Sequence, residues 1–170
     1  MRYLVDTCVL SELRKKKPNP AVVSWLQRHF DGNDFFISAI TIAEILHGIR
    51  KLDPEDPRRK PLTEWLEGDI IEKYGDSILP FDMDAAKKWG EIMAEADSAG
   101  HPRPPLDAQI VAIALAHNLV IVTRNVSDMN FAGVKVVNPF SKQATRDRAR
   151  ESRLKAKRHA TTTATPFPGP

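Results

Sequence analysis

The stretch Tyr3-Leu4-Val5-Asp6-Thr7 opens the chain with apolar residues that end in an acid and a hydroxyl. A short apolar run of this kind predicts a buried strand, here over residues 2–6. The segment 119–123 has the same form and ends in Thr123. A carboxylate at the end of a buried strand is costly to desolvate unless a cation or hydrogen-bond donor compensates it. Asp6 is therefore the first candidate for a functional residue.

Strand-like and helix-like segments alternate along the chain. Strands are predicted at 2–6, 35–38, 78–81, 119–123 and 134–137, and helices at about 20–30, 41–51, 62–71, 82–100 and 106–117. This alternation predicts a three-layer α/β/α sandwich with a central, mostly parallel sheet. Ligands of such sheets bind at the carboxyl ends of the strands, and Asp6 and Thr123 both lie at such ends.

The bulk composition describes one domain with a tail. The 170 residues are 42% hydrophobic and 28% charged, which is ordinary for a globular protein. No apolar run approaches the roughly 18 residues of a membrane span, so we expect no membrane association and a cytoplasmic location. The single cysteine, Cys8, excludes an internal disulfide and an all-cysteine metal site.

Positive charge is concentrated at the C-terminus. Residues 141–170 carry eight Lys or Arg against two acids, a net +6, whereas residues 1–140 carry 17 basic and 20 acidic side chains, a net −3. We therefore expect a domain over 1–140 and a basic, flexible tail over 141–170. Such a tail is either a solvated extension or an aid to nucleic-acid binding without sequence preference.

Four acids, far apart in the sequence, each lie at the end of a hydrophobic segment: Asp6, Glu44, Asp107 and Asp128. Taken singly, each has a structural explanation. Asp6 could cap a helix, Glu44 could complete a capping box begun by Thr41, Asp107 could face a helix N-terminus, and Asp128 could be a loop acid. If the four converge, they form an oxygen-lined site suited to Mg²⁺ or Mn²⁺.

Five segments together resemble the PIN-domain family, and most closely its VapC-type ribonuclease toxins. They are residues 4–12 (Leu-Val-Asp-Thr-Cys-Val-Leu-Ser-Glu), 38–44 (Ser-Ala-Ile-Thr-Ile-Ala-Glu), 78–82 (Ile-Leu-Pro-Phe-Asp), 105–110 (Pro-Leu-Asp-Ala-Gln-Ile) and 122–125 (Val-Thr-Arg-Asn). The resemblance covers about residues 2–140. It implies a Mg²⁺- or Mn²⁺-dependent endoribonuclease, usually a homodimer, that a small cognate antitoxin neutralises.

The resemblance also implies a role for each site residue. Asp6 and Asp107 would be the metal ligands, and Glu44 and Asp128 would complete the acidic pocket. The remaining roles fall on four residues: Thr7, Thr123 and Asn125 would support the ligands, and Arg124 would reach a phosphate of the RNA substrate. The family commonly has Asn or Ser where this chain has Cys8, which puts the support role of that position in doubt.

Three other readings compete with this one. Cys8 and Arg14 have the Cys-x5-Arg spacing of cysteine phosphatases, but the segment between them lacks the glycines that a phosphate-binding loop needs. Glu44 and His47 form one Glu-x-x-His pair, whereas di-iron bundles need two on a four-helix scaffold. The serious alternative is a PIN fold whose main role is RNA binding or regulation, with weak or no nuclease activity.

Overall fold

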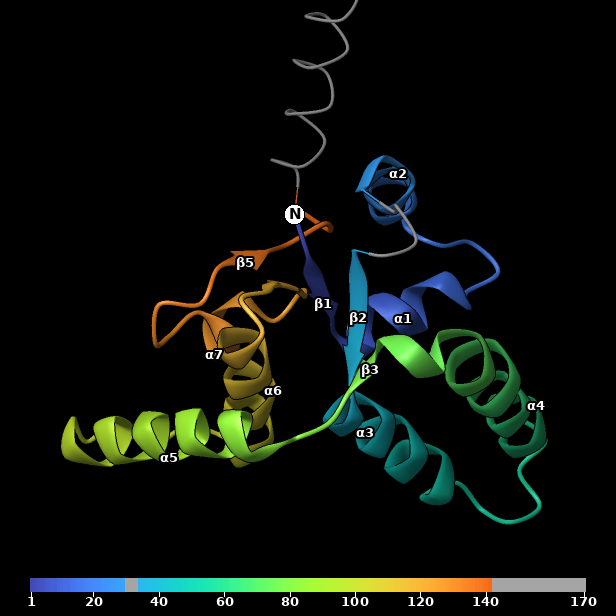
Figure 1. Cartoon of the computed structure of the whole chain (residues 1–170). Helices are drawn as coiled ribbons and strands as arrows, with labels where there is room; N and C mark the ends of the chain where they lie inside the picture. The colour runs from blue at the N-terminus through green and yellow to red at the C-terminus, as the bar shows by residue number, and fades with distance from the viewer. Residues whose placement is uncertain (30–33, 142–170) are drawn as a thin grey trace, which may run out of the picture.

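The computed structural model describes residues 1–29 and 34–141 (Figure 1). Its centre is a five-stranded sheet in the order β3-β2-β1-β4-β5, in which every neighbouring pair is parallel. The strands are β1 (Tyr3–Val5), β2 (Phe35–Ser38), β3 (Ile78–Leu79), β4 (Val120–Val122) and β5 (Val136–Val137). The predicted parallel sheet is confirmed, and the opening stretch of the sequence supplies its middle strand.

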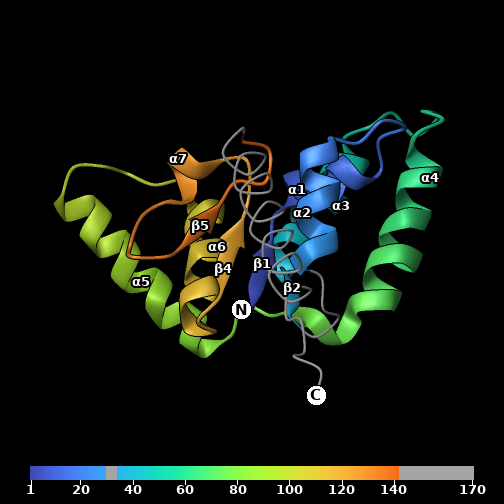
Figure 2. The same ribbon diagram turned by 90° about the horizontal axis from the view of Figure 1, so that it is seen from above.

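Helices cover both faces of the sheet and give the predicted three layers (Figures 1 and 2). One face carries α1 (Thr7–Leu13), α2 (Pro20–His29), α3 (Ala39–Arg50), α4 (Arg59–Glu64) and its π-helical continuation η1 (Trp65–Glu72). The other face carries α5 (Met83–Ser98), α6 (Pro105–Ala116) and α7 (Val126–Met129). A single 3₁₀ turn, η2 (Gly75–Ser77), precedes β3.

Side-chain alternation along β1 assigns its residues to two separate cores. Tyr3 and Val5 pack with the helices of the α1 layer, and Leu4, fully buried, packs with α6. Successive side chains of a strand point to opposite faces of the sheet, so a three-residue strand serves both cores. Leu4 lies opposite Phe36 on β2 and Ile121 on β4.

The apolar helix α6 is buried as its composition predicts. Residues 110–114 of this helix are each 1% exposed or less. Pro105 opens the helix at its first position, where the missing backbone N–H has no partner to lose. The helix therefore begins sharply, and this places Asp107 in its first turn.

Several element boundaries differ from prediction. The helix expected near residue 62 begins at Arg59, because Pro61 is tolerated within the first turn. The strand expected over 78–81 ends at Leu79 because Pro80 cannot donate to a neighbour, and β3 lies at the edge of the sheet, where a proline is tolerated. Asp82 caps α5, since its side chain accepts a hydrogen bond from the Ala85 N–H at 2.9 Å.

The sequence did not predict the two short helices α1 and α7.

Within the described residues, no helix is both long enough and apolar enough to cross a bilayer. The predicted basic tail, apart from Ser141, lies outside the described residues.

Candidate active site

The candidate site lies where the neighbouring strands β1 and β4 end. Val5 is paired with Val122, so the next residues along the two strands, Asp6 and Thr123, lie side by side. The Thr123 hydroxyl donates a 2.6 Å hydrogen bond to Asp6 Oδ2. Both side chains are buried, with 7% of Asp6 and none of Thr123 exposed. The tertiary structure thus brings together the two strand ends that the sequence marked.

Three donors satisfy the Asp6 carboxylate. Its Oδ1 accepts the Thr7 backbone N–H at 2.7 Å, which caps α1. Its Oδ2 accepts the Thr123 hydroxyl and, at 3.1 Å, the Cys8 thiol. A carboxylate has about four acceptor positions, so one position on Oδ1 remains for a further partner. Asp6 therefore caps a helix and is also available as a ligand.

Glu44, on α3, is oriented by Thr7 at the start of the neighbouring helix α1. The Thr7 hydroxyl donates to Glu44 Oε2 at 2.7 Å, which joins the start of α1 to α3. The capping box predicted for Thr41 and Glu44 is wrong. The N-cap of α3 is Ser38, whose hydroxyl accepts the Thr41 N–H at 2.9 Å. The chain enters α3 directly from β2, so the helix begins at Ala39, two residues earlier than expected, and Glu44 lies beyond the first turn.

The pKa of Asp107 indicates that the four acids face a common space. Its pKa is raised to about 6, first by burial and then by the negative charges of Glu44, Asp128 and Asp6. Each of the other three acids is therefore close enough to disfavour ionisation of Asp107. This mutual repulsion is the expected property of a site that binds a cation.

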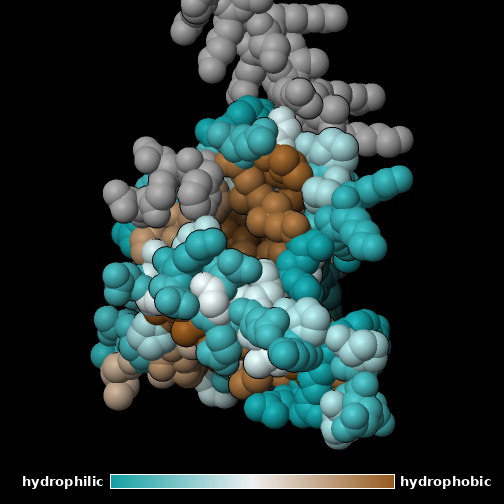
Figure 3. Space-filling model, turned by 90° about the vertical axis from the view of Figure 1, so that its right-hand side faces the viewer, coloured by the Kyte–Doolittle hydropathy of each residue, from teal (hydrophilic) through white to brown (hydrophobic). Residues whose placement is uncertain are grey.

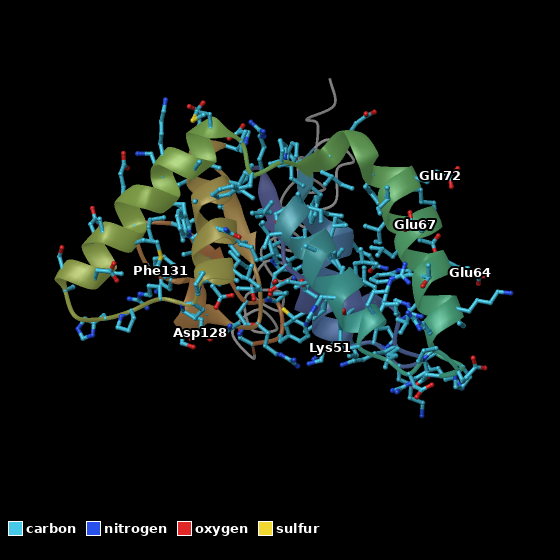
Figure 4. All side chains as sticks on the ribbon, turned by 90° about the horizontal axis from the view of Figure 1, so that it is seen from below. Lys51, Glu64, Glu67, Glu72, Asp128 and Phe131 are labelled. Carbon is cyan, nitrogen blue, oxygen red and sulfur yellow. The ribbon has the colours of Figure 1, made fainter. Side chains whose placement is uncertain are left out.

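Asp128 completes this group from α7, a helix where a loop was predicted. It is partly exposed and accepts the Ser127 hydroxyl at 3.1 Å. In Figure 4, Asp128 lies at the end of the layer that contains α6, and Lys51 lies at the end of α3 in the other layer. Glu64, Glu67 and Glu72, by contrast, line α4 and η1 on the outer side of the molecule (Figure 4).

The residues that follow β4 form the support for Asp6. Thr123 Oγ1 accepts the Asn125 N–H at 2.9 Å, and the Arg124 N–H donates to Cys8 Sγ at 3.2 Å. Cys8 thus links Asp6 to the segment after β4. The thiol therefore makes the supporting contacts that the sequence left in doubt at this position.

The phosphatase reading of Cys8 and Arg14 fails in the structure. Burial, followed by the charge of Asp6, raises the pKa of the Cys8 thiol. A nucleophilic cysteine needs a lowered pKa. The guanidinium of Arg14 lies over the Trp65 ring, 4.9 Å from its centroid, rather than beside the thiol. His47, from the single Glu-x-x-His pair, is exposed in the last turn of α3.

A fifth acid, Glu12, is buried, and the sequence did not predict it as a site residue. Its carboxylate accepts hydrogen bonds from the Lys15 ammonium and, at 2.9 Å, from the Asn19 N–H. The Lys15 bond is the main cause of its lowered pKa. Glu12 therefore links the end of α1 to the start of α2. The sequence signals this structural role only by the spacing of Glu12 three residues before Lys15.

The donor set fits a partly hydrated divalent ion. Within residues 1–29 and 34–141, no three acidic, His or Cys side chains are close enough to enclose a metal by themselves. Mg²⁺ usually keeps several waters and is held by one or two carboxylates, which matches the open arrangement of Asp6 and Asp107. Oxygen-only ligands suit Mg²⁺ or Mn²⁺ rather than softer metals.

Comparison with known proteins identifies the fold. The family model described as PIN domain matches residues 3–136. The chain belongs to the PIN-domain family. VapC ribonuclease Y4jK of Sinorhizobium fredii is 34% identical over 137 residues, which are 81% of this chain and 96% of the relative. Toxin FitB of Neisseria gonorrhoeae is 35% identical over 137 residues, 81% of this chain and 97% of the relative.

Solved structures agree with this assignment. The structure of FitAB bound to an IR36 DNA fragment superposes on this PIN domain with a TM-score of 0.73 and 33% identity, over 82% of this chain and 96% of that chain. DNA-bound VapBC from Salmonella typhimurium gives a TM-score of 0.67 at 23% identity, over 82% and 98%, and supports the fold alone. The predicted resemblance to VapC-type proteins is confirmed.

A second surface feature lies apart from the acids. An apolar hollow of about 700 Å³ opens between α1, α2 and η1 (Figure 3). Its lining includes Leu13, Leu26 and Trp65, and none of the four site acids contributes to it. The acids and the hollow are therefore two distinct surfaces of this PIN domain.

Proposed function

We propose that this PIN domain is a Mg²⁺- or Mn²⁺-dependent endoribonuclease that acts as the toxin of a toxin–antitoxin pair. The observation that carries the proposal is the convergence of Asp6, Glu44 and Asp128 on Asp107, whose pKa they raise. Relatives named as ribonucleases, endonucleases and toxins support it.

The acids would hold the ion, and the residues around them set their geometry. A bound divalent ion supplies an activated water and polarises the phosphate oxygens. Asp6, held by three donors, and Asp107, in the first turn of α6, are the ligands in this proposal. Glu44 is held by Thr7 toward the same space and adds negative charge there.

An empty acidic pocket repels RNA phosphates, so this proposal couples metal binding to RNA binding. Adding Mg²⁺ should tighten RNA binding to a cleavage-deficient protein. Glu44→Gln provides this background while keeping Asp6 and Asp107 as the ligands. RNA affinity that does not respond to Mg²⁺ would show that the coupling is absent.

The decisive test compares acids inside and outside the site. Asp6→Asn and Asp107→Asn should each lower Mg²⁺-dependent RNA cleavage on the order of 10²–10³-fold, while circular dichroism shows the fold retained. Asp84→Asn is the matched control, because Asp84 lies in the first turn of α5 and its side chain is 80% exposed. Cleavage that survives both site substitutions would contradict the proposal.

We assign a small antitoxin and a second copy of the chain as protein partners. A basic antitoxin segment that places an Arg among the acids would replace the metal charge and block cleavage. The apolar hollow beside Leu26 and Trp65 gives such a partner an apolar surface to cover. An antitoxin complex with full nuclease activity would contradict this inhibition, and light scattering of the free protein tests the dimer.

The alternative function is RNA binding or regulation with weak or no cleavage. It would be favoured if the protein bound RNA with equal affinity with and without Mg²⁺ and cut none. The four acids argue against it, because a site devoted to binding phosphate gains nothing from repelling it.

A further inference from the structure

Arg103 is held on an aromatic ring beside the segments that carry Asp107 and Asp128. Its guanidinium lies over the Phe131 ring, with Cζ 4.7 Å from the ring centroid. Arg103 precedes Asp107 by four residues, and Phe131 follows Asp128 by three. Figure 4 shows Phe131 and Asp128 in the same layer of the molecule. The ring contact therefore joins the loop before α6 to the turn after α7, the two segments that bring these acids to the site.

Both members of this pair are held in place. Phe131 packs, partly buried, against the core on the α6 face, and its backbone N–H donates to the Met129 carbonyl at 3.0 Å. Arg103 stands between Pro102 and Pro104. Proline fixes its own φ and restricts the residue before it to extended backbone. Arg103 therefore has little backbone freedom to lose when a ligand binds, which favours binding.

No ion pair within residues 1–29 and 34–141 uses the charge of Arg103. A guanidinium that lies on an aromatic face loses side-chain freedom yet keeps its N–H edge for an anion. This planar fork matches the oxygens of a phosphate. Residues 1–140 carry a net charge of −3, so an RNA strand needs local cations of this kind to approach the acids.

Arg103 belongs to a different segment from Arg124, the arginine that the family resemblance implies as a phosphate contact. Arg124 follows β4, and its guanidinium lies over Phe140, 5.2 Å from the ring centroid. Arg103 lies in the loop that joins α5 to α6, just before the segment 105–110 that carries part of the resemblance. A contact made by Arg103 is therefore one that the resemblance does not imply.

We propose that Arg103, held on Phe131, forms a phosphate-binding subsite beside the acidic pocket and takes an RNA phosphate that flanks the one that is cut. The inference rests on the proposed function, since the same acids cut that strand. The four residues from Arg103 to Asp107 span at most about 14 Å between Cα atoms, so the subsite lies close to the metal ligands. The contact holds the strand both before and during cleavage, so it strengthens RNA binding without changing the chemical step.

The test first measures binding apart from cleavage. Glu44→Gln protein in saturating Mg²⁺ is the background, and fluorescence anisotropy follows its binding to a labelled single-stranded RNA over a KCl series. Adding Arg103→Gln should weaken binding several-fold and reduce the slope of log affinity against log salt by about 0.7, the value for one lost phosphate contact on a single strand. Arg103→Lys should keep the slope but recover only part of the affinity, because an ammonium has the charge without the planar fork. A slope that falls equally in both variants would overturn the phosphate contact.

Arg2→Gln is the matched control. The guanidinium of Arg2 lies over Phe36, also 4.7 Å from the ring centroid. Arg2 precedes β1 and Asp6 follows it, so Arg2 lies at the opposite end of the sheet from the acids. The substitution removes the same charge from the same kind of contact, and we expect it to leave affinity and slope unchanged. An Arg103→Gln effect no larger than that of Arg2→Gln would overturn the proposal.

Steady-state cleavage separates the subsite from a structural role. In otherwise wild-type protein, Arg103→Gln should raise KM several-fold and leave kcat nearly unchanged, because the ground state and the transition state lose the same contact. The urea unfolding midpoints of Arg103→Gln and Arg2→Gln should agree. A lower kcat together with a lower midpoint in Arg103→Gln alone would show that Arg103 only stabilises the loop before α6, and would overturn the subsite.

Neutral methylphosphonate linkages locate the contact. They are placed one at a time beside the cut that wild-type protein makes in the same RNA. At one flanking position the loss of affinity should occur with Arg103 and disappear in Arg103→Gln, and equal losses at every position would overturn the subsite. Mg²⁺-dependent cleavage by wild-type protein with an ineffective Arg103→Gln would refute the subsite alone. A salt slope that depends on Arg103 in a protein that cuts no RNA would refute the nuclease alone.

Discussion

The hydroxyl of Thr123 donates a 2.6 Å hydrogen bond to Asp6 Oδ2, across a sequence separation of 117 residues. The two residues end neighbouring strands of the sheet, so the pairing of β1 with β4 creates the contact. Buried at 0% exposure, Thr123 also accepts the Asn125 N–H. One hydroxyl therefore holds both the central carboxylate and the segment that follows β4.

Replacing this hydroxyl should damage both stability and cleavage. Thr123→Val leaves buried polar groups without a partner, which costs about 1–3 kcal/mol in the free energy of unfolding. Loosening the support of a metal ligand should lower cleavage about 10–100-fold. Urea unfolding and RNA cleavage measure the two effects. Thr63→Val is the control, because that hydroxyl donates to the Arg59 carbonyl within α4, away from the site; an equal loss in both variants would contradict the prediction.

Ionised Asp107 should destabilise the metal-free protein. Its pKa is about 6 when folded against an ordinary 3.8, so the folded state holds the proton more tightly. The penalty is absent below about pH 4, grows between pH 4 and 6, and is complete above pH 6. Two pKa units correspond to about 3 kcal/mol, reduced to about 1–2 kcal/mol because the side chain is partly exposed.

Asp107→Asn should therefore stabilise the protein by about 1–2 kcal/mol at pH 7.5 and by almost nothing near pH 4. Urea unfolding in the presence of a chelator measures both values, with Asp84→Asn as the exposed control. A stabilisation that is the same at the two pH values would show that the neighbouring charges are not its cause. Saturating Mg²⁺ should cancel the advantage of the variant, because the ion stabilises only the wild-type carboxylate set.

Substitution of Ser38 should lower the stability of the protein, whereas substitution of Glu44 should lower its cleavage activity. Ser38→Ala removes the N-cap of α3 and the partner of the Thr41 hydroxyl, which should cost about 1–2 kcal/mol of stability. Glu44→Gln keeps the side-chain oxygen that accepts from Thr7, so the unfolding midpoint should hardly move while cleavage falls. A large loss of stability in Glu44→Gln would contradict this separation.

Cys8 should behave as a supporting residue. Cys8→Ser retains a donor for Asp6 and an acceptor for the Arg124 N–H, so most of the Mg²⁺-dependent cleavage should remain. Cys8→Ala removes both contacts and should lower cleavage about 10–100-fold. The apparent affinity for Mg²⁺ should fall in parallel in Cys8→Ala. Complete loss in Cys8→Ser, without any metal requirement, would instead revive the phosphatase reading.

Much of the fold could be read from hydrophobic patterning. The strands at residues 3–5, 35–38 and 120–122 and the buried helix α6 follow from apolar runs with clear ends. The short helices α1 and α7 could not be read in this way. Each is seven residues or fewer, too short for a helical period to stand out, and α1 depends on a cap from Asp6.

The sequence by itself determined which residues matter at the strand ends, because an acid after an apolar run is conspicuous wherever it occurs. Asp6, Glu44, Asp107 and Asp128 could therefore be named as candidates before any contact was known. Only the tertiary structure decided which atoms meet. The parallel pairing of β1 with β4 joins Asp6 to Thr123, and the entry of α3 at Ser38 frees Glu44 from capping. Such contacts depend on strand order and on the angle at which helices leave the sheet, and local sequence encodes neither.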